Sequence, residues 1–283
     1  MTLGRVAVVG PGRVGLSLAR ALTDAGTEVT LLGRQASVLP GHLGRVETSW
    51  QAGVAAATLV VIAVPDDAIE GVAASLAATS AVTPAHVVLH TSGLHGRSSL
   101  AALEPTGAAL GSWHPLQTFS STHGDPASLA GSPAVIEGDA RALDAGRSLA
   151  VLLALHPVVE LPASGKAVYH AAAVFASNYL VVLGEIAARL AREAGAGGAS
   201  QALFAPLMER TIANFGASGA DALTGPIRRG DIGTIERHLA VLHGEEREVY
   251  LVMGKAALRL ARASGLDDVT ARRIEQLFGA TAR

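Results

Sequence analysis

A glycine-rich turn near the amino terminus constrains the fold of this chain more than any other feature. The apolar run Val6–Val9 is followed directly by Gly10-Pro-Gly-Arg-Val-Gly15, a complete G-x-G-x-x-G motif that opens an amphipathic segment. In a strand–turn–helix unit of this kind, Gly10 permits the tight turn, Gly12 lets a pyrophosphate approach the backbone, and Gly15 lets the helix pack on the sheet. The motif predicts a dinucleotide site formed by Gly10, Pro11, Gly12, Arg13, Val14 and Gly15.

The pattern of apolar runs predicts two domains. As far as about Leu161, short β-branched runs alternate with Ala/Leu-rich segments, which is typical of βαβ units and a mostly parallel sheet. The expected strands are Val6–Val9, Glu28–Leu32, Leu59–Val64, Val87–His90, Ala108–Ser112, Ala134–Glu137 and Val158–Leu161. The expected helices between them are Gly15–Ala25, Asp67–Thr79 and Ala140–Leu155. We therefore expect an α/β domain of the Rossmann type over residues 1–163 and an all-α domain of about five helices over residues 164–283.

Composition excludes several classes of function. The chain has 283 residues, with 22 basic against 24 acidic side chains, so its net charge of −2 makes nucleic acid an unlikely partner. It has no cysteine, which rules out disulfides, thiolate metal sites and cysteine nucleophiles. Several histidines lie close in sequence, but their spacing matches no metal-ligand pattern, and we expect no metal. The charge-free window 167–184 contains His170 and Asn178, which disfavours a membrane span, so we expect a cytoplasmic protein.

The end of the second strand indicates which dinucleotide binds. NAD-binding domains of this type place an acidic side chain there to accept hydrogen bonds from the ribose 2′-hydroxyl, but this chain has Gly33 followed by Arg34. A guanidinium at that point can bind a 2′-phosphate through paired hydrogen bonds. The sequence therefore favours NADP over NAD, although Arg34 could also be an ordinary surface arginine.

Three later turns also follow predicted strands, where ligands of open α/β sheets bind. Val64 and Pro65 are expected beside the nicotinamide. Ser92 and Gly93 offer a hydroxyl and a backbone N–H to a substrate, although Gly93 could simply form a turn. The segment Trp113–Phe119 alternates polar and apolar side chains, and we expect its polar members to face a pocket: His114 in catalysis, and Gln117 and Thr118 in substrate binding. The alternative is that His114 only bonds a core carbonyl.

A long apolar helix is predicted from Tyr169 to Arg192, and its lack of charge predicts burial over much of its length. His170, Ser177, Asn178 and Glu185 would share one face. His170 could donate a proton as hydride arrives, and Asn178 could stabilise the alkoxide. These side chains could equally be core polar groups or an intersubunit network.

Two further features are candidate functional groups. Thr224 and Arg229 belong to a Gly-Pro turn with two adjacent arginines, which could bind a substrate carboxylate, or could be a solvated basic turn. The chain has two lysines, Lys166 and Lys255, and Lys166 is the one worth testing as a general acid.

Taken together, these motifs resemble those of two-domain bacterial proteins with an NADP-type Rossmann domain and a helical domain of formerly unknown function. The resemblance rests on the glycine loop, His90-Thr-Ser-Gly93, Trp113-His-Pro-Leu-Gln-Thr118, Tyr169-His170 with Ser177-Asn178, and Thr224-Gly-Pro226 with Arg229-Gly-Asp231. That family is similar to alternative ketopantoate reductases and pyrroline-5-carboxylate reductases, in the 6-phosphogluconate-dehydrogenase-like clan. The resemblance implies hydride transfer from NADPH to a small 2-oxo acid or cyclic imine, and a homodimer formed through the helical domain.

The chain departs from related enzymes at one position. Common ketopantoate reductases carry a catalytic lysine one helical turn before an asparagine, whereas Val174 stands four residues before Asn178 here, and His170 eight before it. We therefore expect His170 to replace lysine as the acid. Two other functions remain open, namely a non-catalytic NADP-binding sensor and a reductase that uses the deazaflavin F420.

Overall fold

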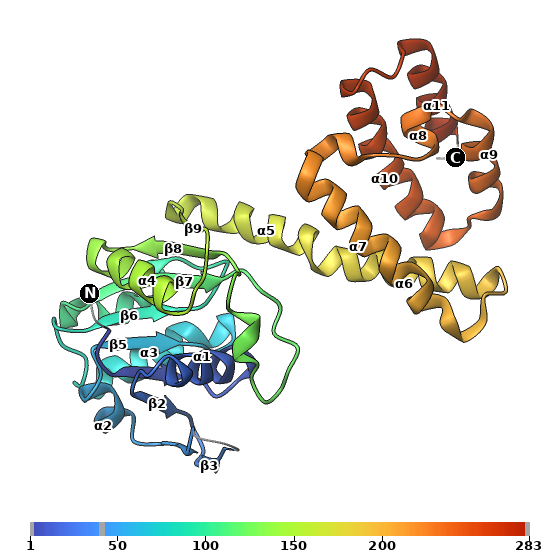
Figure 1. Cartoon of the computed structure of the whole chain (residues 1–283). Helices are drawn as coiled ribbons and strands as arrows, with labels where there is room; N and C mark the ends of the chain where they lie inside the picture. Colours follow the sequence, from blue (N-terminus) through green and yellow to red (C-terminus); the bar gives the residue numbers. More distant parts are fainter. Residues whose placement is uncertain (1–2, 40–42, 281–283) are drawn as a thin grey trace. The chain divides into compact units, whose positions relative to one another are not determined.

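The computed structural model describes residues 3–39 and 43–280, and the chain divides into two compact units, Met1–Asn178 and Tyr179–Arg283 (Figure 1). The first unit contains the predicted α/β domain together with the helix that follows residue 163. The second unit is helical.

The first unit is built on a seven-stranded sheet with the strand order β2-β1-β5-β6-β7-β8-β9. The strands are β1 Val6–Val9, β2 Val29–Leu32, β5 Leu59–Ile62, β6 Val87–His90, β7 Ala109–Pro115, β8 Ala134–Gly138 and β9 Val158–Glu160. All neighbours are parallel except β7 and β8. A small antiparallel pair, β3 Ser37–Val38 and β4 Arg45–Val46, forms a second sheet beside β2, to which it is linked by a bridge between Leu32 and Glu47. The predicted Rossmann-type, mostly parallel sheet is confirmed.

Burial explains why the central strands read as unbroken apolar runs. Every residue of β1 and β5 is buried, because helices cover both faces of a parallel sheet. The sequence predicted a strand over Ala108–Ser112, whereas β7 runs from Ala109 to Pro115. The extension pairs only with the antiparallel β8, at Trp113↔Ile136 through Pro115↔Ala134, a long-range pairing that has no local signal in the sequence.

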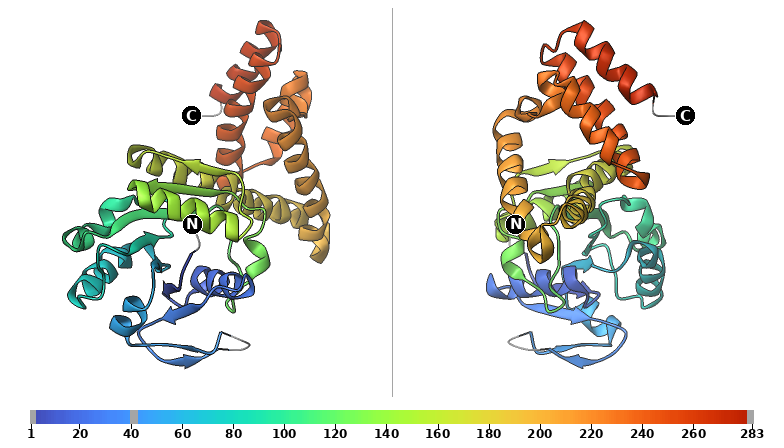
Figure 2. Two further views of the ribbon diagram at one scale, coloured as in Figure 1. Left: turned by 60° about the vertical axis from the view of Figure 1, so that its left-hand side comes forward. Right: turned by 90° about the vertical axis from the view of Figure 1, so that its right-hand side faces the viewer.

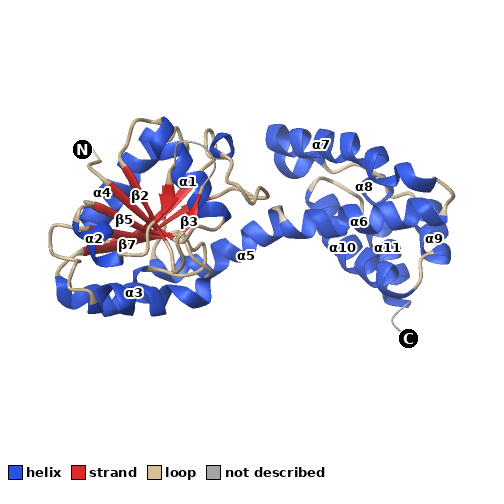
Figure 3. Ribbon diagram, turned by 90° about the horizontal axis from the view of Figure 1, so that it is seen from below, coloured by secondary structure: helices blue, strands red, loops and turns tan. Residues whose placement is uncertain are grey.

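Helices pack on both faces of this sheet (Figure 3). One face is covered by α1 and α4, whose apolar side chains cluster around Leu18, Trp113 and Leu149. The other face is covered by α2, α3 and η2, which cluster around Ile62, Leu76 and Leu100. The bounds are α1 Arg13–Asp24, α2 Trp50–Ala55, η1 Asp66–Ala68, α3 Ile69–Ala78, η2 Arg97–Thr106, η3 Pro126–Ser128, α4 Ala140–Leu152, η4 Ala163–Gly165 and α5 Lys166–Ala176.

The second unit consists of helices, as predicted. They are α6 Asn178–Glu193, which begins at the last residue of the first unit, η5 Gly197–Ala199, α7 Ser200–Ser218, η6 Gly219–Ala222, α8 Pro226–Arg229, α9 Ile232–Val241, α10 Gly244–Ala263 and α11 Asp268–Ala280. A small core around Ile235, Leu258 and Phe278 joins α9, α10 and α11, and Figure 2 shows α10 and α11 in orange-red and red. Arg189 on α6 forms an ion pair of 2.6 Å with Glu246 on α10.

The predicted long helix departs from expectation in two ways. It is split at Ser177 into α5 and α6, and its predicted burial is wrong, because Phe175 is 70% and Val181 72% exposed. Residues 163–193 are long and apolar enough to cross a membrane by length and composition, yet only 6% of the most apolar window is buried. The lack of charged residues predicted burial of this helix, but the sequence does not identify a surface of the same chain that would cover it.

Candidate active site

The three glycines of the loop after β1 have the separate roles that the motif requires. Gly10 has a φ of +109°, and a Cβ there would overlap the carbonyl oxygen of Ala63 at the end of β5. A Cβ on Gly15 would overlap the Gly10 carbonyl oxygen. In contrast, no atom lies within 4 Å of a Cβ placed on Gly12. The loop is therefore closed where it packs on the sheet and open where a pyrophosphate would approach the N-terminus of α1.

A cavity of about 870 Å³ lies over this loop, at the carboxyl ends of β1, β2 and β5. Its size is within the range of cofactor sites. Seven predicted cofactor residues line it: Gly10, Pro11, Gly12, Gly33, Arg34, Val64 and Pro65. The lining also includes Thr48, Trp50 and Ser75, which no sequence motif indicated. Arg13, Val14 and Gly15 form the first turn of α1 beside it and do not line it. These residues fit a bound dinucleotide.

The position that carries an acid in NAD-binding domains is closed in this structure. Gly33 is buried, and a Cβ there would lie 2.7 Å from Val46 Cγ1 and 3.2 Å from Pro11 Cγ. The Trp50 indole N–H donates a hydrogen bond of 3.0 Å to the Gly33 carbonyl and holds this backbone in place. An acidic side chain at residue 33 would force these neighbours apart, whereas the adjacent Arg34 is exposed on the cavity rim.

A second cavity of about 580 Å³ lies between the end of β7 and helix α5. It is lined by His114, Leu116, Gln117, Thr118, Tyr169, His170, Ala172, Ala173, Val174, Ala176, Ser177 and Asn178. Five of the predicted catalytic and substrate residues, distant in sequence, thus share one cavity: His114, Gln117, Thr118, His170 and Asn178. Glu185, predicted on the same face, lies outside it and pairs with Arg192 at 2.9 Å.

Two imidazoles and a phenol form the polar wall of this second cavity. His114 Nδ1 and the Tyr169 hydroxyl are joined by a hydrogen bond of 2.8 Å, and the two rings meet nearly edge to face at 80°. Burial lowers the pKa of His114 to about 4 and raises that of Tyr169 to about 12. Both groups are therefore neutral at pH 7. The buried Nδ1 of His170 has no hydrogen-bond partner within the protein.

Gly93 lies between these two imidazoles. A Cβ at this position would be 2.8 Å from His170 Nδ1 and 3.0 Å from His114 Nε2. Any side chain here would push the histidines apart, so glycine is required by close approach. The neighbouring Ser92 hydroxyl accepts hydrogen bonds from the backbone N–H groups of Leu94 and His95. That hydroxyl shapes the turn.

Lys166 is buried behind this turn, with 1% of its surface exposed. Its ammonium donates hydrogen bonds of 2.9 Å to the Ser92 carbonyl and to the Ser112 hydroxyl. Burial lowers its pKa to about 8, and Glu137 and Asp66 oppose that shift. Lys166 stands one helical turn before His170, so a lysine is indeed present near the site. It stands twelve residues before Asn178, outside the four-residue spacing of the related enzymes, and the role of His170 as the acid stays a prediction.

Thr224 and Arg229 belong to the second unit. They lie there in a cavity of about 660 Å³, together with Asp221, Leu223, Gly225, Arg228, Gly265, Leu266 and Asp267. Neighbouring Arg228 donates a hydrogen bond of 3.0 Å to the Ser264 carbonyl. Across residues 3–39 and 43–280, no group of three or more His, Asp or Glu side chains could hold a metal ion.

Comparison with known proteins agrees with the two parts of the chain. Residues 2–115 match the model of the Rossmann-like domain, and residues 132–257 match that of a domain of unknown function, DUF2520. No curated protein sequence matches the chain significantly. The resemblance to Rossmann proteins with a helical domain of formerly unknown function is thus confirmed.

Three solved structures illustrate the shared fold. A Bacteroides fragilis protein provisionally described as an NADP oxidoreductase is 20% identical, with a TM-score of 0.71, over 90% of this chain and 97% of that one. A Thermotoga maritima protein is 22% identical, with a TM-score of 0.67, over 92% and 99%. Plasmodium falciparum pyrroline carboxylate reductase, solved with NADP bound, is 14% identical, with a TM-score of 0.61, over 94% and 99%. This chain therefore has the fold of nicotinamide-dependent oxidoreductases.

Proposed function

We propose that this protein is an NADPH-dependent reductase that transfers a hydride to the C=O or C=N carbon of a small 2-oxo acid, such as ketopantoate, or of a cyclic imine. One observation carries the proposal. A dinucleotide-sized cavity over the glycine loop and a second cavity walled by His114, Tyr169 and His170 both occur in the first unit, at the carboxyl ends of its strands. This is the edge at which open α/β sheets bind their ligands.

The proposed preference for NADP over NAD follows from the lack of space for a side chain at Gly33. Val46 and Pro11 fill the space that a Cβ at residue 33 would need, and no Asp or Glu is among the residues that line the cavity, so a 2′-hydroxyl has no acidic partner there. Arg34, exposed on the rim of the same cavity, can bind a 2′-phosphate instead. When bound, the reduced nicotinamide supplies the hydride, and the protein supplies orientation and a proton.

The proton is assigned to His170. The reduced substrate needs one proton on its oxygen or nitrogen, and His170, whose buried Nδ1 has no hydrogen-bond partner within the protein, lines the second cavity. His114 remains neutral and can hold the substrate oxygen or nitrogen by a hydrogen bond, with its ring fixed by Tyr169. Lys166 fixes the turn at Ser92 and supplies a buried positive charge nearby, which stabilises developing negative charge on an oxygen.

The other side chains of the second cavity suit a small substrate. Ala172, Ala173 and Ala176 form an apolar wall, while Gln117 and Thr118 offer neutral hydrogen-bonding groups. The binding of a substrate carboxylate by Thr224 and Arg229 stays a prediction.

We also propose that a second copy of the chain covers the apolar helices of the second unit. On α7, Leu207 is 61% and Phe215 66% exposed, which is unusual for large apolar side chains in a protein that acts as a monomer. In the apolar stretch 163–193, which precedes α7, the polar His170, Ser177 and Asn178 argue against a lipid neighbour.

Steady-state kinetics with NADPH and either ketopantoate or pyrroline-5-carboxylate test the proposed reaction. We expect turnover with one of them, a loss of about 100- to 1,000-fold in kcat for His170→Ala, and an unchanged NADPH affinity. His123→Ala, an exposed histidine of the same unit, is the control. Binding of NADPH without turnover of any carbonyl or imine substrate would favour the sensor, and turnover only with reduced F420 would favour the deazaflavin enzyme.

A further inference from the structure

A buried carboxylate lies on the sheet opposite Ser112, a hydrogen-bond partner of Lys166. Glu137 on β8 is 7% exposed and stands directly opposite Ser112 of β7 in the antiparallel register. Directly opposed residues of an antiparallel pair project their side chains from the same face of the sheet. Glu137 and the Ser112 hydroxyl, which accepts a hydrogen bond from Lys166, therefore lie on one face.

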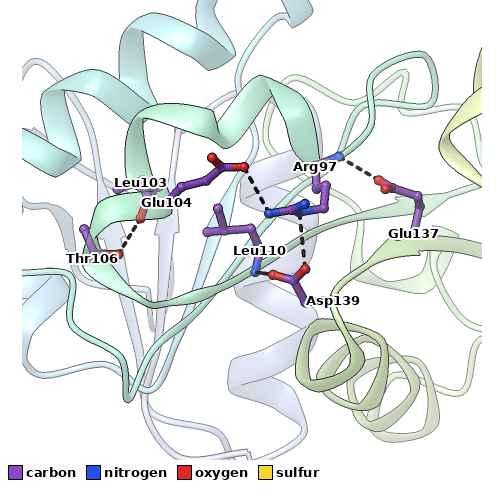
Figure 4. A network of polar contacts seen from close by, with 7 residues as sticks. All are labelled: Arg97, Leu103, Glu104, Thr106, Leu110, Glu137 and Asp139. Atoms are coloured by element: carbon purple, nitrogen blue, oxygen red, sulfur yellow. Dashed lines mark hydrogen bonds and ion pairs between the residues drawn. The ribbon is translucent and has the colours of Figure 1, made fainter.

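The Glu137 carboxylate holds the far end of the turn that contains Gly93. Its Oε2 accepts a hydrogen bond of 2.7 Å from the backbone N–H of Arg97, and it lies 2.9 Å from a Cβ placed on Gly96. Figure 4 shows this contact beside the Arg97 guanidinium, which pairs separately with Glu104 at 3.1 Å and Asp139 at 3.3 Å. The Arg97 guanidinium therefore pairs with Glu104 and Asp139 and not with Glu137, which bonds only the backbone N–H of Arg97.

His90 connects the two ends of this turn. The Ser92 N–H donates to His90 Nδ1 at 3.2 Å, and His90 Nε2–H donates to the Gly96 carbonyl at 3.0 Å. The imidazole is therefore neutral, with its proton on Nε2. This agrees with its burial, which lowers its pKa to about 4. Lys166 holds the turn at Ser92 and Glu137 holds it at Arg97, so the position of Gly93 between the catalytic imidazoles depends on both.

We propose that Glu137 is a positioning residue for this site: its carboxylate fixes the turn over residues 91–97 and is the buried counter-charge that keeps Lys166 protonated on Ser92 and Ser112. The proposal deepens the proposed function and rests on it for the role of the turn in catalysis. Asp66 also faces Lys166 and favours its charged form, but more weakly. His90 and His114 face it as well and are neutral above a pH of about 4.

The two lysines of the chain allow a direct test without substrate or cofactor. In protein labelled with carbon-13 at lysine Cε, the exposed Lys255 gives the second lysine signal and serves as the internal reference. Lys166 is expected to titrate near 8 in the wild type, and about one pH unit lower in Glu137→Gln, which keeps the shape of the side chain and removes its charge. Glu160→Gln, on the neighbouring β9 and paired with Arg147 at the surface, should leave Lys166 unchanged.

The kinetic readout should follow the titration. The alkaline limb of kcat is expected to move to lower pH with Lys166 in Glu137→Gln, while NADPH affinity stays within twofold of the wild type. Glu137→Asp keeps the charge but shortens the side chain, so it should preserve the Lys166 titration and speed amide exchange at Arg97 about tenfold. Glu137→Asp therefore still tests the proposal if Glu137→Gln does not fold.

An unchanged Lys166 titration in Glu137→Gln, or unchanged Arg97 exchange in Glu137→Asp, would overturn the proposal. Failure of the proposed function has a different signature. If no carbonyl or imine substrate is turned over, the reductase assignment is wrong, whereas the titration and exchange experiments still report whether Glu137 holds Lys166 and the turn.

Discussion

The two units of this chain handle their apolar side chains in opposite ways. In the first unit, both faces of the sheet are covered, and residues such as Val8, Ile62 and Trp113 have at most 1% of their surface exposed. In the second unit, a small core around Phe278 coexists with large exposed side chains on α6 and α7. The first unit therefore has a well-buried core around its sheet and contains both candidate cavities of the proposed reaction. The second unit presents an exposed apolar surface, where we propose that a second copy of the chain binds.

The most disruptive test of this comparison targets the second unit. Leu207→Glu combined with Phe215→Glu places two charges on the exposed apolar face of α7. Desolvating a carboxylate without a counter-charge is so unfavourable that the dimer dissociation constant should rise more than about 1,000-fold. Sedimentation velocity over a concentration series measures this change.

The control for that experiment is Glu209→Gln, which changes an exposed polar residue of the same helix and should leave the dimer intact. A wild-type chain that sediments as a monomer at every concentration would refute the proposed dimer. Binding of the wild type, but not of the double variant, to lipid vesicles would show that a membrane covers this face instead.

The second test separates packing from ligand binding inside the first unit. Gly12→Val projects into open space, so NADPH affinity should fall more than about 100-fold while the Tm hardly changes. Gly15→Ala meets the Gly10 carbonyl and should destabilise the unit by about 3 kcal/mol. Calorimetric titration and thermal unfolding measure the two effects. If Gly12→Val still binds NADPH normally, the pyrophosphate does not lie over this loop.

A smaller effect is expected from the buried imidazole of His90. Its pKa is lowered to about 4, so the unfolded chain binds this proton more tightly than the folded one. The contribution to stability is complete above the unfolded pKa of about 6.5 and is lost as the pH falls towards 4. Urea unfolding should show a loss of about 2 kcal/mol from this group between pH 7 and pH 5.

The variant His90→Gln tests the assignment of that pH dependence. It should flatten the loss of stability between pH 7 and pH 5, whereas the exposed His123→Gln should leave the slope as in the wild type. An identical slope in all three proteins would place the acid sensitivity elsewhere, and His114, whose pKa is lowered in the same direction, is the next group to examine.

The sequence was most informative where function depends on a local motif. The glycine loop, the strand ends and the absence of an acid at Gly33 are all readable from neighbouring residues, and the structure places them around one cavity. His114 and His170 could be selected as polar residues in apolar segments. Their approach on either side of Gly93 depends on the packing of β7 against α5, which no local pattern reveals.

The features that sequence reasoning missed are all long-range contacts. Trp50 braces Gly33 from 17 residues away, and Tyr169 fixes His114 from 55 residues away. Lys166 was singled out only because lysine is rare here, since its partners Ser92 and Ser112 lie on other strand ends. The burial of α5 and α6 was predicted wrongly for a related reason. The lack of charged residues predicted that these helices are buried, but the sequence does not identify the surface against which they would pack.

The central claim is that the first unit binds NADPH over the glycine loop, with Arg34 at the 2′-phosphate. Calorimetric titration with NADPH and NADH, on the wild type, Arg34→Ala and the exposed control Arg147→Ala, tests it most directly. We expect tighter binding of NADPH than of NADH, and a loss of about 10- to 100-fold in NADPH affinity, with little change for NADH, in Arg34→Ala alone. Failure of the wild type to bind either nucleotide, or equal weakening of both by Arg34→Ala, would contradict the claim.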